Sequence, residues 1–384
     1  MSPLPPTSTI GIVGGGQLGR MSALAAARLG YRCHVLTDGP NSPAAQVASS
    51  ITVGDYNDLA ALELFSESCD VISFEFENID AAGLELLRRH RPVRPSPEIL
   101  RIAQDRVTEK SFLNGIDIPT APWRQVTCIA DLQTAVTELG LPTVLKTTRL
   151  GYDGKGQALL RTPEDLAPAF ASLDPKPLIL EGFIDFACEL SVIVARNPSG
   201  QIAVFDAVQN LHKHHILDLT LAPAPIDPAI AQVAQDYARK LAEALQLEGL
   251  LALELFVDRD GRVLANEMAP RPHNSGHWTI DACAVSQFEM HIRAVADLPL
   301  PPATRHADAV MKNLVGPDDL ALWPEIVATP GLIPHHYGKS EARPGRKMGH
   351  VTVLFPRGAL PGPFGIRDAL GKLAEDLFVR SDNK

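Results

Sequence analysis

The sequence lacks the features that mark several classes of protein. Its 384 residues carry a formal net charge of −10, without the excess of lysine and arginine that a general nucleic-acid binder shows. The apolar stretches are short and interrupted, so no transmembrane helix is predicted. The N-terminal residues show no basic segment followed by an apolar one, so we expect no signal peptide.

Cysteine is scarce and scattered. Five cysteines occur, at positions 33, 69, 128, 188 and 283. They form no CxxC motif and no cluster with histidine, which argues against both a disulfide framework and a zinc site. We therefore expect a protein of the reducing cytoplasm.

The chain does contain enough apolar residues, 45%, for the cores of two or three domains. Strands are expected at 9–13, 32–36, 51–53, 71–76, 143–147, 178–183, 188–195, 201–208 and 350–355, and helices near 105–113 and at 228–246. Early strands that alternate with helical patterns indicate a parallel α/β sheet. Proline-rich segments at 91–97 and 297–304 separate the units, and the tail after the second segment is expected to hold short strands.

Two glutamates, Glu254 and Glu267, are equally far from a turn signal. Asp260-Gly261 lies between two apolar runs and is typical of a two-residue hairpin turn. That turn pairs Glu254 with Glu267, which places their Cβ atoms about 4.5–5.5 Å apart on one face of the sheet. Adjacent carboxylates repel each other unless a cation bridges them, and Mg²⁺ bound by carboxylates and phosphates is a common nucleotide site. The alternative is an exposed pair whose strands are offset by a bulge.

The segment Gly14–Gly19 matches the pattern G-x-G-x-x-G between a predicted strand and a predicted helix. Glycines let the backbone approach a phosphate, and a helix N-terminus favours an anion. Asp38 follows the second strand, where a nicotinamide enzyme would hold the ribose, so this segment is the best argument for an NAD-dependent oxidoreductase. A tight turn from strand to helix explains the same glycines without any ligand.

A second glycine-rich segment, 151–157, follows Lys146 at the end of an apolar strand and contains Lys155. Its backbone N–H groups and the two lysines could close over a triphosphate, although the segment is not a P-loop and a solvated hairpin is the alternative. The apolar strands that follow carry Glu181 and Glu189. Either carboxylate could contact a nucleoside or merely reach solvent.

Polar clusters complete the candidate residues. The segment 266–278 contains Arg271, whose forked donors suit a phosphate, and His273, which can donate a hydrogen bond to a polar substrate. The basic segment 343–350 could hold one phosphate or be a solvated charge run. The tract 209–215 is rich in histidine, but without cysteine or spaced carboxylates we interpret it as a loop near the active site.

Together these segments resemble N5-carboxyaminoimidazole ribonucleotide synthetase, the ATPase subunit of phosphoribosylaminoimidazole carboxylase, in the ATP-grasp superfamily. The resemblance rests on GGGQLGR at 14–20, FEFEN at 74–78, GYDGKGQ at 151–157, ELF at 254–256, NEMAPRPHNSGHW at 266–278 and RPGRKMGH at 343–350. It spans about 10–355 in the family's order, and the joining of NExxPR to HNSGHW is its most specific part.

The resemblance implies an α/β ATP-grasp fold. Its parts would be a Rossmann-like domain at 1–105, an ATP-grasp domain at 106–300 with a mobile lid at about 118–182, and a small β-rich domain at 301–384. Aminoimidazole ribonucleotide, bicarbonate and MgATP would react through carboxyphosphate to N5-carboxyaminoimidazole ribonucleotide, ADP and phosphate, in purine biosynthesis. We also expect a cytoplasmic homodimer that binds neither nucleic acid nor a membrane.

The resemblance also assigns roles to matching residues. Mg²⁺, with Mn²⁺ as an alternative, would be bound by Glu254 and Glu267. ATP would be bound by Arg106, Lys146, Gly151, Tyr152, Asp153, Gly154, Lys155, Gly156, Gln157, Glu181, Gly182, Phe183, Ile184, Glu189, His212, Asn266 and Glu267. The ribonucleotide would be bound by Gly16, Gln17, Leu18, Glu75, Tyr152, Asp153, Arg271, His273, Ser275, Lys339, Arg346 and Lys347. The catalytic residues would be Asp153, Lys155, His212, Asn266 and Arg271.

One position departs from the family's pattern. Family members often read Asn-x-His-x-x-Gly-Ile-Leu in the histidine-rich tract, and here His215 stands where glycine is usual. Glycine gives easy access to a positive φ, so the substitution leaves the backbone of this tract, and with it the place of His212, open.

Three other functions compete with this interpretation. One is an ATP-grasp ligase with a different acceptor, such as a formate-dependent glycinamide ribonucleotide transformylase or another carboxylase. The second is the NAD-dependent oxidoreductase built on Gly14–Gly19, and the third is a nucleotide-binding module without catalysis.

Overall fold

The computed structural model describes residues 3–149, 151, 155–174 and 177–374. Its N-terminal sheet is parallel, in the order β3-β2-β1-β4. The strands are β1 (Thr9–Val13), β2 (Arg32–Thr37), β3 (Ser50–Val53) and β4 (Val71–Phe74). One face packs on α1 (Gln17–Arg28), and the other packs on α2 (Leu59–Glu67) and α3 (Ala81–His90). The predicted parallel unit is therefore confirmed, although β4 ends at Phe74 and not at 76.

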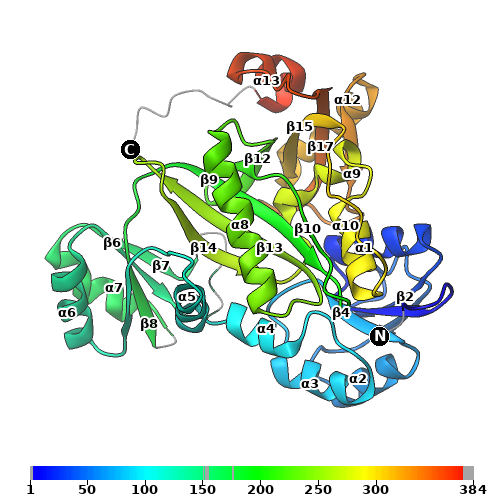
Figure 1. Ribbon diagram of the computed structural model, residues 1–384, viewed down its shortest axis with the longest axis horizontal. Coiled ribbons are helices and arrows are strands. Elements are labelled where there is room, and N and C mark those ends of the chain that lie inside the picture. Colours follow the sequence, from blue (N-terminus) through cyan, green and yellow to red (C-terminus); the bar gives the residue numbers. More distant parts are fainter. Residues whose placement is uncertain (1–2, 150, 152–154, 175–176, 375–384) are drawn as a thin grey trace.

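A separate antiparallel sheet follows, in the order β5-β8-β6-β7. Its strands are β5 (Trp123–Val126), β6 (Thr143–Thr147), β7 (Gln157–Leu160) and β8 (Leu178–Gly182). Two helices, α6 (Ile129–Leu139) and α7 (Leu166–Ser172), bury their apolar sides against it. This lobe projects from the rest of the molecule, at the left of Figure 1.

In the part of the chain that the structure describes, the largest sheet has nine strands, and all of its neighbouring strands are antiparallel. Its main path is β14 (Val263–Ala269), β13 (Gly249–Asp258), β9 (Phe186–Arg196), β11 (Val208–Lys213), β12 (Ile216–Ala222), β15 (Ala307–Val315), β17 (Lys347–Pro356) and β16 (Ile333–His336), and β10 (Ile202–Val204) pairs with β9. The predicted strand at 201–208 is therefore wrong, because β10 and β11 are separate strands.

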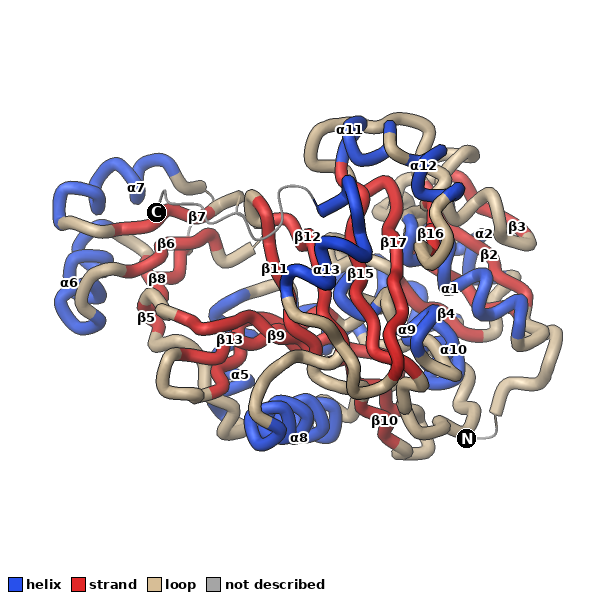
Figure 2. The backbone as a smooth tube through the Cα atoms, turned by 90° about the horizontal axis from the view of Figure 1, so that it is seen from above, coloured by secondary structure: helices blue, strands red, loops and turns tan. Residues whose placement is uncertain are grey.

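Helices cover both faces of this central sheet. Side chains alternate along β9, so that Leu190, Val192 and Val194 join the core under α8 (Pro228–Ala244), while Ile193 and Ala195 join the core under α10 (Gln287–Val295). The predicted helix at 228–246 is confirmed, with its end two residues earlier. The view in Figure 2 shows α8 and α10 beside the sheet.

The tail after residue 300 contains one short strand, as expected, in β16, but its other two strands are long. β15 has 9 residues and β17 has 10, and β15 pairs along β12, so these strands continue the central sheet. The remaining helices are α4 (Pro97–Ala103), α5 (Arg106–Gly115), α9 (Thr279–Ala282), α11 (Gly316–Ala321), α12 (Trp323–Ala328) and α13 (Pro363–Leu370). None of the helices described is long and apolar enough to cross a bilayer.

Candidate functional site

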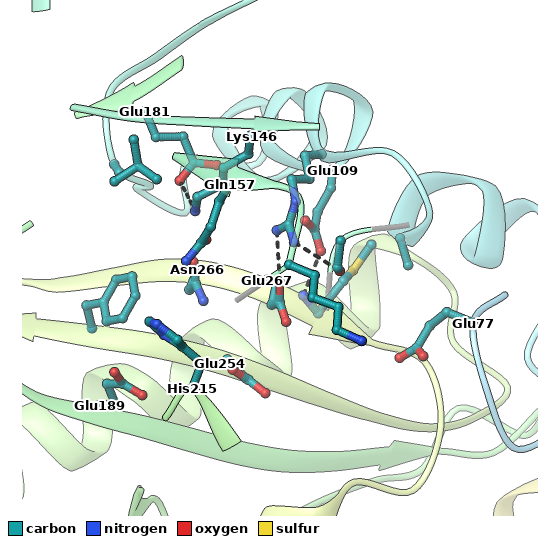
Figure 3. A pocket seen from close by; sticks show the side chains of 18 of the residues that line it. Glu77, Glu109, Lys146, Gln157, Glu181, Glu189, His215, Glu254, Asn266 and Glu267 are labelled. Atoms are coloured by element: carbon teal, nitrogen blue, oxygen red, sulfur yellow. Dashed lines mark hydrogen bonds and ion pairs between the residues drawn. The ribbon is translucent and has the colours of Figure 1, made fainter. Parts of the chain in front are cut away.

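A cavity of about 550 Å³ lies between the β5–β8 lobe and the central sheet. This volume is within the range of small-molecule sites. The predicted residues that line it are Arg106, Lys146, Gly151, Lys155, Gln157, Glu181, Gly182, Phe183, Ile184, Glu189, His212, Glu254, Asn266, Glu267, Arg271, His273 and Lys347. Figure 3 shows Lys146 and Glu181 on the opposite side of the cavity from Glu189 and Glu254.

The other predicted residues are not among those that line the cavity. They are Gly16, Gln17, Leu18, Glu75, Gly156, Ser275, Lys339 and Arg346. Three further predictions, on Tyr152, Asp153 and Gly154, fall outside the described residues.

The hairpin of β13 and β14 pairs Glu254 with Glu267, as the sequence predicted, but not by the predicted turn. The turn is one residue longer, because Asp258 N–H donates to the Arg262 carbonyl and Gly261 adopts a φ of +81°. This is the three-residue loop that ends in a left-handed glycine. A bulge at Asn266 adds one residue to β14, and this restores the pairing of the two glutamates.

The two glutamates have different partners. Glu267 accepts a hydrogen bond from Arg106 at 2.9 Å, and Glu254 lies 3.0 Å from Nε2 of His273. Burial raises the pKa of Glu254, but the hydrogen bond from His273 and the charge of Arg271 oppose burial, and the net effect is a lowered pKa. Because the two carboxylates lie on paired strands and provide hard oxygen donors, they fit a Mg²⁺ or Mn²⁺ ion.

The edge strand β14 contacts α5, the helix predicted near 105–113, through two side chains to which the sequence gave no role. Glu109 accepts the backbone N–H of Met268 at 2.6 Å, and Lys110 donates to the carbonyl of the bulged Asn266 at 3.3 Å. Both α5 side chains are buried. Burial and the charge of Glu267 raise the pKa of Glu109 to about 8. The only sequence signal was an acid–base pair early in a predicted helix, a pattern that also suits an exposed helix surface.

Lysines converge on Glu181 at the opposite wall. Oε2 of Glu181 lies 2.9 Å from Nζ of Lys146 and 3.4 Å from Nζ of Lys110. Burial raises the pKa of Glu181, but the two ammonium groups dominate and lower it to about 2. Burial lowers the pKa of Lys146, and Glu181 opposes that change. The lobe therefore presents a partly neutralised cationic wall, and Phe183 and Phe186 add an apolar part beside it.

The hairpin of β11 and β12 resolves the question raised by His215. The tract predicted as a loop is mostly strand, because only His214 and His215 form the turn. Both residues have positive φ, 51° and 64°, as a two-residue turn of this type requires. His215 thus keeps the conformation that glycine would favour, and His212 lines the cavity 2.6 Å from Glu189.

The glycine pattern at 14–19 holds one of the protein's own carboxylates. Glu75 accepts the backbone N–H groups of Gly16 and Gly19 at the start of α1, the latter at 2.7 Å. A Cβ at Gly14 would lie 2.4 Å from the Glu75 side chain, so glycine is needed for this close approach. Burial raises the pKa of Glu75, and the two N–H donors oppose the change. A dinucleotide phosphate would have to displace this carboxylate, which argues against the oxidoreductase alternative.

Basic residues gather at the end of the cavity near Glu75. Lys347 lines the cavity, and Lys339 donates to its carbonyl at 2.6 Å. Burial and the charge of Arg346 lower the pKa of Lys339 to about 8, while Glu75 opposes them. Arg271 lies 2.6 Å from Glu77, another lining residue that sequence reasoning did not assign a role.

Ser275 lies deeper than predicted. Its side chain is fully buried, and its hydroxyl bonds with Ser191 at 2.6 Å and with Nδ1 of His273 at 2.8 Å. Ser275 thus lies behind His273, which lines the cavity, and does not line the cavity itself.

A histidine cluster lies outside the cavity. His335 is 2.9 Å from Asp281, and its ring stacks on the ring of His350 with centroids 4.4 Å apart and planes 9° apart. Imidazole lone pairs lie in the ring plane, so face-to-face rings favour the Asp281–His335 hydrogen bond over an ion shared by both histidines.

Comparisons with known proteins agree with this geometry. Family models match three successive segments: a ribonucleotide synthetase preATP-grasp domain at residues 7–104, an ATP-grasp domain at 111–288 and a phosphoribosylaminoimidazole carboxylase C-terminal domain at 309–359. The N5-carboxyaminoimidazole ribonucleotide synthase of Brucella melitensis is 51% identical over 92% of this chain and 98% of that protein. The chain belongs to the N5-carboxyaminoimidazole ribonucleotide synthase family. It is an ATP-grasp ligase, and the α/β ATP-grasp fold implied by the sequence is confirmed.

Other members support the same assignment. The Bacillus subtilis synthase is 44% identical over 91% of this chain and 92% of its own length. A Staphylococcus aureus N5-carboxyaminoimidazole synthetase complexed with ADP aligns with a TM-score of 0.91 at 37% identity, over 97% of this chain and 99% of that one. An Aspergillus clavatus synthase in complex with ADP and 5-aminoimidazole ribonucleotide aligns at 0.88 and 32% identity, over 96% and 97%.

Proposed function

We propose that this protein carboxylates 5-aminoimidazole ribonucleotide with bicarbonate and ATP. The products are N5-carboxyaminoimidazole ribonucleotide, ADP and phosphate. The observation that carries the proposal is a single cavity in which the paired residues Glu254 and Glu267 lie on the central sheet, Lys146 lies on the lobe across from Glu254, and Arg106 contacts Glu267. The relatives named above, one of them bound to ADP and 5-aminoimidazole ribonucleotide, support the choice of substrates.

Phosphoryl transfer depends on positioning and charge neutralisation more than on covalent chemistry by the protein. Arg106 and Lys146 would neutralise the phosphates of ATP, and Phe183 and Phe186 offer apolar surface for its base. Mg²⁺ bound by Glu254 and Glu267 would supply further positive charge next to the transferred phosphoryl group.

The acceptor would bind at the other end of the cavity. Lys347 and Lys339 provide positive charge for a ribonucleotide phosphate, and Arg271 also lines the cavity. Bicarbonate would attack the γ-phosphorus, and the resulting carboxyphosphate would deliver CO₂ to the acceptor amine. His212 and Asn266 line the cavity where these groups would meet.

The β5–β8 lobe is proposed as the lid. It joins the central sheet through the segments that flank β5 and β8, and it carries Lys146 and Glu181 above the cavity. Carboxyphosphate is labile in water, so closure of the lobe over the nucleotide would protect the intermediate.

The decisive experiment measures ADP release from MgATP with and without 5-aminoimidazole ribonucleotide and bicarbonate. Strong stimulation by both, with the labile carboxylated product formed, is the expected result. If adding the ribonucleotide left the rate of ADP release unchanged, the acceptor would be a different molecule. If no substrate set produced turnover while MgATP bound, the protein would be a binding module.

Two finer proposals accompany this function. We propose that the protein is a homodimer and works in the cytoplasm, as its resemblance to the family implies. Light scattering coupled to size-exclusion chromatography distinguishes one chain of 41.4 kDa from a dimer, and fractionation of the source cells tests the compartment.

A further inference from the structure

A buried chain of polar side chains runs from Glu254 into the central sheet. Its members after Glu254, here called the Ser275 chain, are His273, Ser275, Ser191, Asn210 and Thr220. The successive contacts measure 3.0, 2.8, 2.6, 2.9 and 3.0 Å. The chain joins β13, the 273–275 segment, β9, β11 and β12, so it connects both hairpins that border the cavity.

The hydrogen bonds of this chain have one direction. The Asn210 amide donates to the hydroxyl of Ser191, which donates to Ser275. The hydroxyl of Ser275 is then free to donate to Nδ1 of His273. The backbone N–H of Ser275 also points at Nδ1, at 3.4 Å, and a backbone N–H can only donate. Nδ1 is therefore the acceptor, and Nε2 carries the proton that faces Glu254.

Every member beyond His273 is buried. Ser191, Ser275 and Thr220 are fully buried, and Asn210 is 6% exposed. Buried hydroxyl and amide groups destabilise a fold unless they are paired, and a connected set strengthens its own hydrogen bonds. A set that is complete and ends on a carboxylate in the cavity is well suited to fix the position of that carboxylate.

We propose that the Ser275 chain is a positioning device, which locks His273 in its Nε2–H tautomer and thereby holds Glu254 for the cation. The proposal rests on the proposed function, because it takes Glu254 as a cation ligand. With the other tautomer, His273 would turn a bare nitrogen toward Glu254 and repel it. Partners behind the groups that touch a metal commonly set ligand orientation in this way. Ser191, Asn210 and Thr220 thus gain a role although none of them reaches the cavity.

A network that only stabilises the fold would contain the same contacts, so the experiment needs a matched control. Ser73 provides one, because it is 1% exposed and its hydroxyl lies 3.0 Å from Nε2 of the buried His291, away from the cavity. The variants are Ser275→Ala and Ser191→Ala, with Ser73→Ala as the control and Ser191→Thr to restore the hydroxyl.

The first readout is the tautomer itself. Imidazole ¹⁵N shifts in histidine-labelled protein distinguish a protonated from a bare ring nitrogen, and His273→Gln identifies the His273 signals. In the wild type we expect a bare Nδ1 and a protonated Nε2. Ser275→Ala and Ser191→Ala should add signals of the second tautomer, whereas Ser73→Ala should leave His273 unchanged. This readout needs neither metal nor substrate, so it separates the proposal from the proposed function.

The second readout is the free Mg²⁺ concentration that half-saturates ADP release. We expect a rise of roughly 10-fold or more in Ser275→Ala and Ser191→Ala, largely restored in Ser191→Thr, with a much smaller change in the KM of the ribonucleotide. If both chain variants matched Ser73→Ala in the His273 signals and in the Mg²⁺ response, the chain would be structural only and the proposal would be wrong. If the wild type released no ADP, the proposed function would fail, and the ¹⁵N shifts alone would decide whether the chain sets the tautomer.

Discussion

Two hairpins of the central sheet border the cavity, and their turns differ in length. The β13–β14 hairpin turns through three residues and places Gly261 at a positive φ. The β11–β12 hairpin turns through two residues, His214 and His215, both at positive φ. Yet each hairpin has a bulge beside a residue of the proposed site, next to Glu254 in the first and next to His212 in the second.

In each hairpin the turn and the bulge together determine which residues lie opposite each other. A one-residue shift in register moves a side chain to the opposite face of a sheet. In the first hairpin the longer turn shifts the register by one residue, and the bulge at Asn266 shifts it back. A bulge can therefore offset an extra residue in the turn and keep Glu254 opposite Glu267.

The largest expected effect comes from the first hairpin. Glu267→Gln removes a proposed cation ligand and the ionic partner of Arg106, so ADP release should fall by more than about 100-fold with the fold intact. The matched control is Asp260→Asn, which removes a carboxylate from the exposed tip of the same hairpin and should stay near the wild-type rate. If Glu267→Gln released ADP at close to the wild-type rate, the assignment of Glu267 as a cation ligand would be wrong.

The support of the first bulge can be tested from α5. Lys110→Met removes the buried donor to Asn266 and one of the two ammonium groups on Glu181. We expect the free energy of unfolding to fall by about 3 kcal/mol, because the buried carboxylate of Glu181 loses one of its two ionic partners. Lys240→Met is the control, since its ion pair with Asp117 is exposed. Urea unfolding of both variants makes the measurement, and equal losses would show that the α5 contact adds nothing special.

The second hairpin should respond to pH. Burial lowers the pKa of His212, but its hydrogen bond to Glu189 raises it above the ordinary value of 6.5. The ion pair therefore stabilises the fold fully below about pH 6.5 and is lost as the pH rises through the higher folded-state pKa. Glu189→Gln should cost up to about 1 kcal/mol at pH 6 and close to nothing at pH 9.

Urea unfolding at the two pH values makes this measurement. Asp185→Asn removes an exposed partner of Arg259 and serves as the control without a titrating histidine. A cost of Glu189→Gln that grew with pH would contradict the assigned direction of the His212 shift.

The smallest effects come from the turns. His215→Gly should raise the free energy of unfolding by about 0.5–1 kcal/mol, since a left-handed residue other than glycine is strained. Gly261→Ala should lower it by about 1 kcal/mol. No tight contact opposes the new methyl group, because its nearest neighbour would be Ile230 at 3.5 Å. Thermal unfolding measures both variants. Activity should change little in Gly261→Ala, and a large loss there would show that the turn is needed to place the site; His215 lines the cavity, so activity is not the readout for His215→Gly.

Sequence patterns predicted the N-terminal sheet and the pairing of Glu254 with Glu267. The alternation of strands and helices is local, and the structure shows it except between β2 and β3, where the described residues form no helix. The pairing was correct for an incomplete reason, because two deviations of one residue cancel. Neither deviation could be read from the local sequence. Asp260-Gly261 is compatible with either turn length, and Asn266, the bulged residue, does not by itself predict a bulge.

The residues that sequence reasoning missed act across long separations. Lys110 reaches Asn266, and Glu109 reaches Met268, over more than 150 positions. Ser191 meets Ser275 across 84 positions. Charged residues in a helix and serines in strands are common on protein surfaces, so only the packing of α5 and the central sheet reveals their roles.

Because the central sheet is continuous, a cut between β12 and β15 would expose unpaired strand edges on both fragments. β12 and β15 belong to segments that family models treat as separate domains, yet their backbones pair from Leu219 with Lys312 to Ala222 with Ala309. A fragment that ends before β15 would leave β12 as an open edge, and the complementary fragment would leave β15 open. Unpaired edges recruit other strands, so each half expressed alone should aggregate, and the two should be soluble only when they are produced together.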